Sequence, residues 1–205
     1  MKNMTITYEV DGALYVNITN RCSNRCEFCI RNNGDGAYGS DSLWLEREPT
    51  CDEIFNSIAL RNPENYTELV FCGYGEPTER LDDMIEVAKR VKEKYSVKIR
   101  VNTNGQSSLI NGYDTAVCFQ GVIDAVSISL NAPDAKGYDR ICHSVFKEAA
   151  FDGILRFASN VKKYVNTVIF SVVDASLSNE EIEECYKIAN EVGIPLRVRK
   201  YIGNE

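Results

Sequence analysis

The chain contains very little histidine: His143 is the only one among its 205 residues. It also has only one cysteine pair with the C-x2-C spacing, Cys26 and Cys29. Structural zinc sites take four cysteine or histidine ligands, commonly from two such short motifs. A zinc knuckle is therefore disfavoured. A fourth ligand could still come from one of five scattered cysteines: Cys51, Cys72, Cys118, Cys142 or Cys185.

Long apolar runs and an excess of basic residues are missing as well. No run of about 18 apolar residues occurs, which argues against a membrane-spanning helix. Residues 1–9 lack the apolar stretch of a secretory signal peptide. The net charge of −7 argues against general binding to nucleic acid or to a membrane surface. We therefore expect a cytoplasmic protein.

The eight cysteines do not indicate a disulfide framework in that compartment. Cytoplasmic thiols are usually reduced, and a cysteine motif there more often binds a metal or takes part in catalysis. The chain has no evident linker, internal repeat or low-complexity segment. Its length suits one substantial core, so we expect residues 1–205 to form a single domain.

Short apolar runs alternate with amphipathic stretches along the chain. Asp11-Gly12 predicts a hairpin turn between strands over 4–10 and 13–19. Further strands are expected over 69–72, 97–102, 123–130, 167–173 and 196–202. Helices are expected from residue 50, over 81–95, 146–164 and 178–192, with a short helix within 107–119 and a long loop over 31–49. Capping boxes are expected for the first and last of these helices, from Thr50 with Glu53 and from Ser178 with Glu181.

This alternation predicts a parallel sheet joined by right-handed crossovers. Six strands follow the first hairpin strand, fewer than the eight of a closed barrel. The pattern of elements fits a doubly wound sheet and a partial barrel equally well.

Three cysteines near the N-terminus, Cys22, Cys26 and Cys29, carry the most specific motif, with the spacing C-x3-C-x2-C. A cluster that only carries electrons usually has four protein ligands. Three thiolates suit a four-iron cluster in which one iron keeps an open coordination site. Such an iron is available for chemistry.

A second motif, Cys72-Gly-Tyr-Gly-Glu-Pro-Thr78, follows the strand expected over 69–72. Glycine lets the backbone approach a ligand closely. The carboxylate of Glu76 can accept a charge-assisted hydrogen bond from an ammonium group. Barrel active sites form at this end of the strands. The alternative is a plain turn that begins the next helix.

Polar side chains alternate with apolar ones on two later strands. Ser127, Ser129 and Asn131 fall on one face of the strand over 123–130, which suits a lumen that holds a polar ligand. Arg197 and Arg199 share a face of the last strand. Facing the lumen they would meet an anion, whereas facing the helices they would extend to solvent.

Together these motifs resemble the radical S-adenosylmethionine (SAM) superfamily, and the resemblance runs from Leu14 to Tyr201. It implies an α/β fold, a partial, laterally open (βα)6 TIM-type barrel with a short N-terminal hairpin strand. It implies a [4Fe-4S] cluster on the three cysteines and SAM at the open iron. The positions that match the family's SAM contacts are Phe28, Tyr74, Gly75, Glu76, Pro77, Asn102, Ser129, Asn131, Ser171 and Arg199.

The resemblance also implies a reaction. A flavodoxin- or ferredoxin-type reductant supplies an electron, SAM is cleaved to methionine and a 5′-deoxyadenosyl radical, and the radical takes hydrogen from a substrate that the sequence does not identify. The strings Leu-Tyr-Val-Asn-Ile-Thr-Asn-Arg-Cys and Arg-Val-Arg-Lys-Tyr are similar to small radical SAM proteins associated with TatD-family hydrolases.

The sequence leaves two alternative hypotheses about the function open. One is an activase for glycyl-radical enzymes, but Ser129 and Asn131 stand where activases favour an acid and a lysine. The other is an iron–sulfur protein for electron transfer or sensing without SAM turnover. Such a protein needs no clamp for an amino group, so the motif around Glu76 disfavours it.

Overall fold

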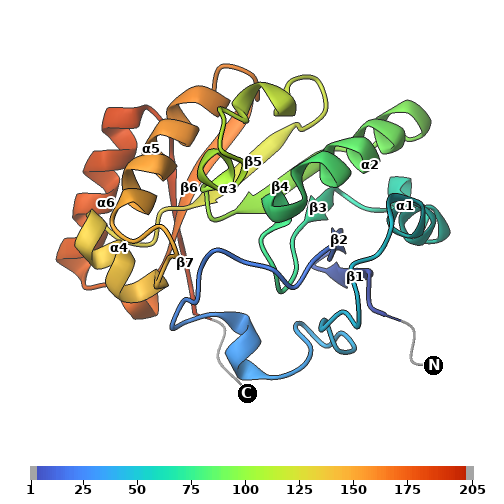
Figure 1. Cartoon of the computed structure of the whole chain (residues 1–205), viewed down its shortest axis with the longest axis horizontal. Coiled ribbons are helices and arrows are strands. Elements are labelled where there is room, and N and C mark those ends of the chain that lie inside the picture. The colour runs from blue at the N-terminus through green and yellow to red at the C-terminus, as the bar shows by residue number, and fades with distance from the viewer. Residues whose placement is uncertain (1–3, 202–205) are drawn as a thin grey trace.

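The computed structural model describes residues 4–201, in which seven strands form one sheet (Figure 1). The strands are β1 (Thr7–Val10), β2 (Ala13–Val16), β3 (Leu69–Phe71), β4 (Ile99–Thr103), β5 (Ala125–Ser129), β6 (Thr167–Val173) and β7 (Leu196–Arg199). The helices are α1 (Cys51–Leu60), α2 (Leu81–Lys94), α3 (Ser107–Asn111), α4 (Ala135–Cys142), α5 (Ala149–Val161) and α6 (Asn179–Val192). No helix in this part of the chain is long and apolar enough to cross a membrane.

The order of the strands decides between the two expected architectures. The strands lie side by side in chain order from β1 to β7, with β1 antiparallel to β2 and every later pair parallel. A doubly wound sheet would reverse this order at a switch point. Over residues 4–201 the sheet stays unclosed, with β1 and β7 at its two edges. The partial, laterally open barrel is confirmed.

Local sequence explains where several elements begin. Asp11 and Gly12 both have positive φ, 49° and 77°, as the tight turn of the hairpin requires. The expected capping boxes are present at two helices, Thr50 with Glu53 at α1 and Ser178 with Glu181 at α6. These caps satisfy backbone N–H groups that the first helical turn leaves without partners.

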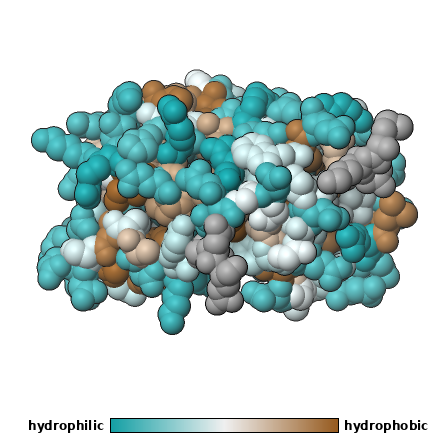
Figure 2. Space-filling view, turned by 90° about the horizontal axis from the view of Figure 1, so that it is seen from below, coloured by the Kyte–Doolittle hydropathy of each residue, from teal (hydrophilic) through white to brown (hydrophobic). Residues whose placement is uncertain are grey.

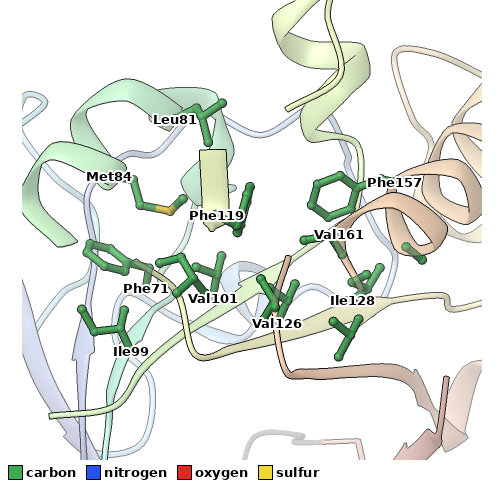
Figure 3. Packing of buried hydrophobic residues seen from close by; sticks show 14 of the residues in the cluster. Phe71, Leu81, Met84, Ile99, Val101, Phe119, Val126, Ile128, Phe157 and Val161 are labelled. Carbon is green, nitrogen blue, oxygen red and sulfur yellow. The ribbon is translucent and has the colours of Figure 1, made fainter. Parts of the chain in front are cut away.

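The main hydrophobic core lies between the helices and the outer face of the sheet (Figure 3). Phe71, Val101 and Ile128 are fully buried there, each from a different strand. Phe119 and Phe157 meet edge to face with ring centroids 5.6 Å apart. Because side chains alternate along a strand, this apolar outer face leaves the polar positions of β4 to β7 on the inner face.

The loop that follows the cysteines covers part of the inner face. Its residues Ala37 and Leu43 are buried in a second hydrophobic cluster with Tyr8, Val10 and Tyr74. In Figure 1 this segment crosses below the sheet, on the side away from the helices. Figure 2 views the molecule from that side, where hydrophilic residues cover most of the surface and hydrophobic areas are small and separate.

The helix expected over 146–164 is present as α5, Ala149–Val161, whereas α4 was not expected. The side chain of Asp134 caps α4 by accepting from the Gly137 N–H at 2.7 Å. Left-handed backbone at His143 and Lys147 turns the chain before α5. The short length and the glycine within α4 weaken its helical pattern in the sequence.

Four strands also end earlier than expected, among them β2 at Val16 instead of 19 and β3 at Phe71 instead of 72. β5 ends at Ser129, and Asn131 has a φ of 58°, so the period-two alternation does not extend to Asn131. β7 ends at Arg199, and residue 202 of the expected strand lies outside the described residues. Strand ends depend on tertiary contacts that the local pattern does not contain.

Two glycines with the same backbone conformation give a test of the packing behind β4. Gly105 and Gly112 have φ of 76° and 77°. A Cβ on Gly105 would lie 2.7 Å from Ile128 Cγ2, whereas a Cβ on Gly112 would meet nothing within 4 Å. We expect Gly112→Ala to cost about 1 kcal/mol of unfolding free energy through backbone strain. Gly105→Ala should cost roughly 1–3 kcal/mol more through overpacking.

Urea unfolding followed by circular dichroism measures both values. Equal losses in the two variants would contradict the tight packing of Gly105 against the core.

Candidate functional site

A cavity of about 430 Å³ lies on the inner face of the sheet. Its walls come from the N-terminal hairpin, the cysteine loop, residues 37–43, and the carboxyl ends of β4 to β7. Parallel strands bring their carboxyl ends to one edge, which is where barrel proteins place their sites. This cavity is the candidate site.

Strand register gathers the polar residues of the inner face into adjacent rows. Asn102 pairs with Ser127 across β4 and β5. Ser129, Ser171 and Arg197 are successive partners across β5, β6 and β7. Four of these residues line the cavity, while Ser171 is buried beneath it. The last strand also turns Arg199 into the cavity, so both arginines face the lumen rather than the helices.

The three motif cysteines are divided between two cavities. Cys26 and Cys29 line the main cavity together with Phe28. Cys22 lines a neighbouring cavity of about 520 Å³, with Val145 and other residues on its walls. All three thiols are partly exposed and free of disulfide bonds. A ligand set that bridges two cavities gives a bound group access from both.

Backbone hydrogen bonds tie the cysteine loop to the end of α4. The Arg25 N–H donates to the Cys142 carbonyl at 2.9 Å, and the Glu27 N–H donates to the Ile141 carbonyl at 3.1 Å. The Val145 N–H donates to the Ser23 carbonyl at 2.9 Å. The helix that the sequence failed to reveal is therefore the support on which the cysteine loop rests.

A buried polar network lies under the same loop. Gln106 donates to Asn24 at 2.8 Å and to the Tyr138 hydroxyl at 2.9 Å, and it accepts from Ser23 and Ser144. All five residues are buried. Gln106 is a positioning residue that the sequence analysis missed. Its only signal was its place directly after the Asn-Gly turn that ends β4.

The donor set fits a multi-iron cluster better than a single ion. Over residues 4–201 no three Cys, His, Asp or Glu side chains converge as the ligands of one metal ion do. Thiolates of a four-iron cluster bind separate irons and need not converge on one point. Burial raises the pKa of Cys22 to about 12, with the charge of Glu76 adding to the rise. A hydrogen bond with Cys142 and burial raise the pKa of Cys26. Ligation must therefore displace these protons.

Glu76 has different neighbours from those expected. It is 4% exposed and does not line the main cavity. Its carboxylate accepts from the N–H and hydroxyl of Thr78, from the Thr103 hydroxyl at 2.7 Å and from the Asn104 N–H at 2.6 Å. Burial raises the pKa of Glu76, and these hydrogen bonds oppose the rise. The carboxylate thus ties the turn after β3 to the end of β4.

The glycines of the second motif let two chain segments meet. A Cβ on Gly75 would lie 2.3 Å from the Thr19 carbonyl oxygen and 2.6 Å from that of Arg21. The Glu76 N–H donates to the same Arg21 carbonyl at 2.8 Å. This contact fixes the entry to the cysteine loop, and Pro77 begins the 3₁₀ turn that follows.

Tyr74 connects this turn to the long loop. Its hydroxyl donates to the Gly34 carbonyl at 2.6 Å, and its ring meets Trp44 edge to face with centroids 5.0 Å apart. Tyr74 lines the main cavity, as does Tyr38 from the loop. The loop is therefore a wall of the cavity.

Two of the residues predicted to contact SAM, Asn102 and Asn131, differ in their burial. Asn102 lines the cavity, and its Oδ1 accepts from Arg100 at 2.6 Å. Asn131 is 3% exposed and absent from the cavity wall. Its Nδ2 donates to the Cys142 sulfur at 3.7 Å, while its Oδ1 has no partner over the described residues. The left-handed backbone at Asn131 turns its side chain toward the end of α4.

The role of Glu76 can be tested by Glu76→Gln. The NH2 group of glutamine would replace an accepting carboxylate oxygen, while the groups around the side chain all donate to it. We therefore expect a loss of about 1–3 kcal/mol of unfolding free energy. Glu79→Gln makes the same charge change three residues away. Over residues 4–201 the Glu79 carboxylate has no side-chain hydrogen bond, so this variant should lose much less. Urea unfolding measures both. A Glu76→Gln protein that keeps its stability but binds SAM more weakly would contradict this structural role of Glu76 and favour a direct contact with SAM.

Several solved structures share the fold of this chain. The chain aligns with a structure of TYW1 with a lysine-pyruvate adduct bound, at a TM-score of 0.65 and 16% identity, covering 93% of this chain and 65% of that one. It aligns with SuiB of Streptococcus suis bound to S-adenosylmethionine at a TM-score of 0.62 and 18% identity, covering 92% and 38%. At these identities the likeness is one of fold.

A curated relative also matches most of the chain. Molybdenum cofactor biosynthesis protein 1 of Dictyostelium discoideum is 24% identical over 198 residues, which is 92% of this chain and 28% of that protein. The chain spans about a quarter of the length of the curated relatives it matches.

The family model of the Radical SAM superfamily matches residues 16–195. That range contains the three cysteines, the turn around Glu76 and the inner-face polar residues of β4, β5 and β6. Members of this family bind a [4Fe-4S] cluster and S-adenosylmethionine, which agrees with the donor set and the cavity beside it. The chain belongs to the radical SAM superfamily.

Proposed function

We propose that this protein is a radical SAM enzyme that cleaves SAM reductively and takes a hydrogen atom from a substrate in the main cavity. One observation carries the proposal. Two motif cysteines, the aromatic Phe28 and polar residues of β4, β5 and β7 line the same cavity. A cluster that only carried electrons would need no such cavity beside its ligands.

The residues of the chain bind and orient, while the cofactors supply the hard step. When bound, the cluster and SAM provide the 5′-deoxyadenosyl radical. Cys22, Cys26 and Cys29 would hold the cluster as thiolates after losing their protons. The network around Gln106 and the backbone bonds to α4 keep the loop in place for this.

The predicted SAM contacts divide by position. Asn102, Ser129 and Arg199 line the cavity and are suited to direct contact, the first two with ribose hydroxyls and Arg199 with a carboxylate. Phe28 and Tyr74 supply flat apolar walls. The remaining residues are better suited to shaping the site from behind: the half-buried Gly75 and the buried Glu76, Pro77, Asn131 and Ser171.

The electron would come from a flavodoxin- or ferredoxin-type protein. The cavity beside Cys22 supports an entry point there, because it is separate from the main cavity and Val145 on its wall is 68% exposed. A donor could reach the cluster by this route while SAM and substrate fill the other side.

The proposal extends to the subgroup and its context. The strings beginning at Leu14 and Arg197 support a place among the small TatD-associated radical SAM proteins, with a TatD-family hydrolase as a partner. The free thiols support a reducing, cytoplasmic setting. An activase for glycyl-radical enzymes is less well supported, since the cavity wall on β5 presents only Ser127 and Ser129.

The test is the formation of 5′-deoxyadenosine. Protein reconstituted anaerobically with iron and sulfide, then given dithionite and SAM, should form this product, detected by chromatography. Cys26→Ala should form none, because one cluster ligand is lost. Cys185→Ala removes a buried thiol on α6, away from both cavities, and should match the unaltered protein.

A protein that forms an intact cluster but yields no 5′-deoxyadenosine would contradict the proposed enzymatic activity and favour a role in electron transfer or sensing. Equal product from Cys26→Ala would show that the cysteine motif is not the source of the chemistry.

A further inference from the structure

The open side of the main cavity holds three cations without acidic partners. Arg197, Arg199 and Lys200 line the cavity, and over residues 4–201 none of them has a salt bridge or a side-chain hydrogen bond. The fourth cation of the wall, Arg100, pairs with Glu68 at 2.7 Å. Among the described residues 4–201, Asp11 is the only acidic residue that lines the same cavity.

This excess of positive charge is local, because the whole chain has a net charge of −7. Other arginines are paired with carboxylates, including Arg21, Arg47, Arg80 and Arg140. Three free cations against Asp11 leave a surplus of two in the cavity. A [4Fe-4S]²⁺ cluster on three thiolates carries one net negative charge. SAM, with one carboxylate against an ammonium and a sulfonium group, carries one net positive charge. Together the two cofactors therefore leave the positive surplus unchanged.

The segment that carries these cations is anchored at both ends. Register places Arg197 beside Ser171 and Arg199 beside Val173 of β6. Beyond the strand, the Tyr201 N–H donates to Asp174 at 3.0 Å, and the Tyr201 hydroxyl donates to Asn33 at 3.3 Å. The last bond joins the end of β7 to the segment after the cysteines. The cations are therefore held over the cavity.

Protection of a sheet edge is the other use of such charges, because lysine and arginine on an exposed edge hinder pairing with a second sheet. Protection alone would not require the side chains to line a cavity with two motif cysteines. The charge of Arg199 also reaches across the cavity to the loop: burial raises the pKa of Tyr38, and Arg199 opposes that rise.

We propose that the substrate of this site is an anion, a small molecule whose carboxylate or phosphate groups are bound by Arg197 and Lys200 at the open side of the barrel. This inference rests on the proposed function, because it names the substrate class of the same cavity. Guanidinium groups match the planar carboxylate and the phosphate through paired N–H donors, and lysine adds a point charge. Tyr15 and Tyr38 would flank the rest of the molecule.

Calorimetric titration tests the proposal without turnover. Cluster-loaded protein saturated with SAM, without reductant, is titrated anaerobically with pyrophosphate and, separately, with succinate at constant ionic strength. We expect millimolar or tighter binding of at least one anion. Arg197→Gln and Lys200→Gln should each weaken it about tenfold or more, as loss of a charged hydrogen-bond donor does.

Arg156→Gln is the matched control. Arg156 is an exposed arginine of α5, away from this cavity, and within residues 4–201 it has no salt bridge. Its loss should leave anion binding unchanged. Melting curves of all variants check that they are folded. Binding of pyrophosphate alone would identify a phosphate substrate, and binding of succinate alone a carboxylate. Binding of both would support anion recognition by charge.

Failure to bind either anion, or equal binding by the cavity variants and the unaltered protein, would overturn the proposal. The result is separable from the proposed function. A protein that binds pyrophosphate through Arg197 and Lys200 but forms no 5′-deoxyadenosine would contradict only the radical chemistry.

Discussion

The close approach between the turn after β3 and the chain leaving β2 is the contact on which the site depends. Gly75 leaves no room for a Cβ against the carbonyl oxygens of Thr19 and Arg21, and the Glu76 N–H donates to the Arg21 carbonyl. The carboxylate of Glu76 then holds the end of β4. Three consecutive strand ends are fixed relative to one another, and the cysteine loop begins at this junction.

The parts of the fold that the sequence predicts are those with strong local patterns. The hairpin at Asp11-Gly12, the capping boxes of α1 and α6, and the strand–helix alternation all depend on residues close together in the chain. Strand order could not be deduced from that alternation, because a doubly wound sheet and an open barrel share it. The resemblance carried by the cysteine motif supplied that choice, and the order from β1 to β7 agrees with it.

The features that escaped prediction depend on contacts across the sequence. α4 is short and has a glycine in it, yet its end supports the cysteine loop through backbone bonds to Arg25 and Glu27. Gln106 gathers partners from 82 residues earlier and 32 residues later in the chain. A motif identified Glu76 but not the direction of its carboxylate, which turns inward to Thr103 and Asn104. Such partners become visible only when the chain is folded.

We infer that three thiolates leave one iron of a four-iron cluster open to SAM. The most direct measurement is electron paramagnetic resonance of the reduced, reconstituted protein, with SAM labelled with ¹⁷O in its carboxylate. We expect SAM to change the spectrum of the cluster and the ¹⁷O label to couple to the cluster. A spectrum that is unchanged by SAM, with no coupling to the label, would contradict the account and indicate a cluster without an open iron.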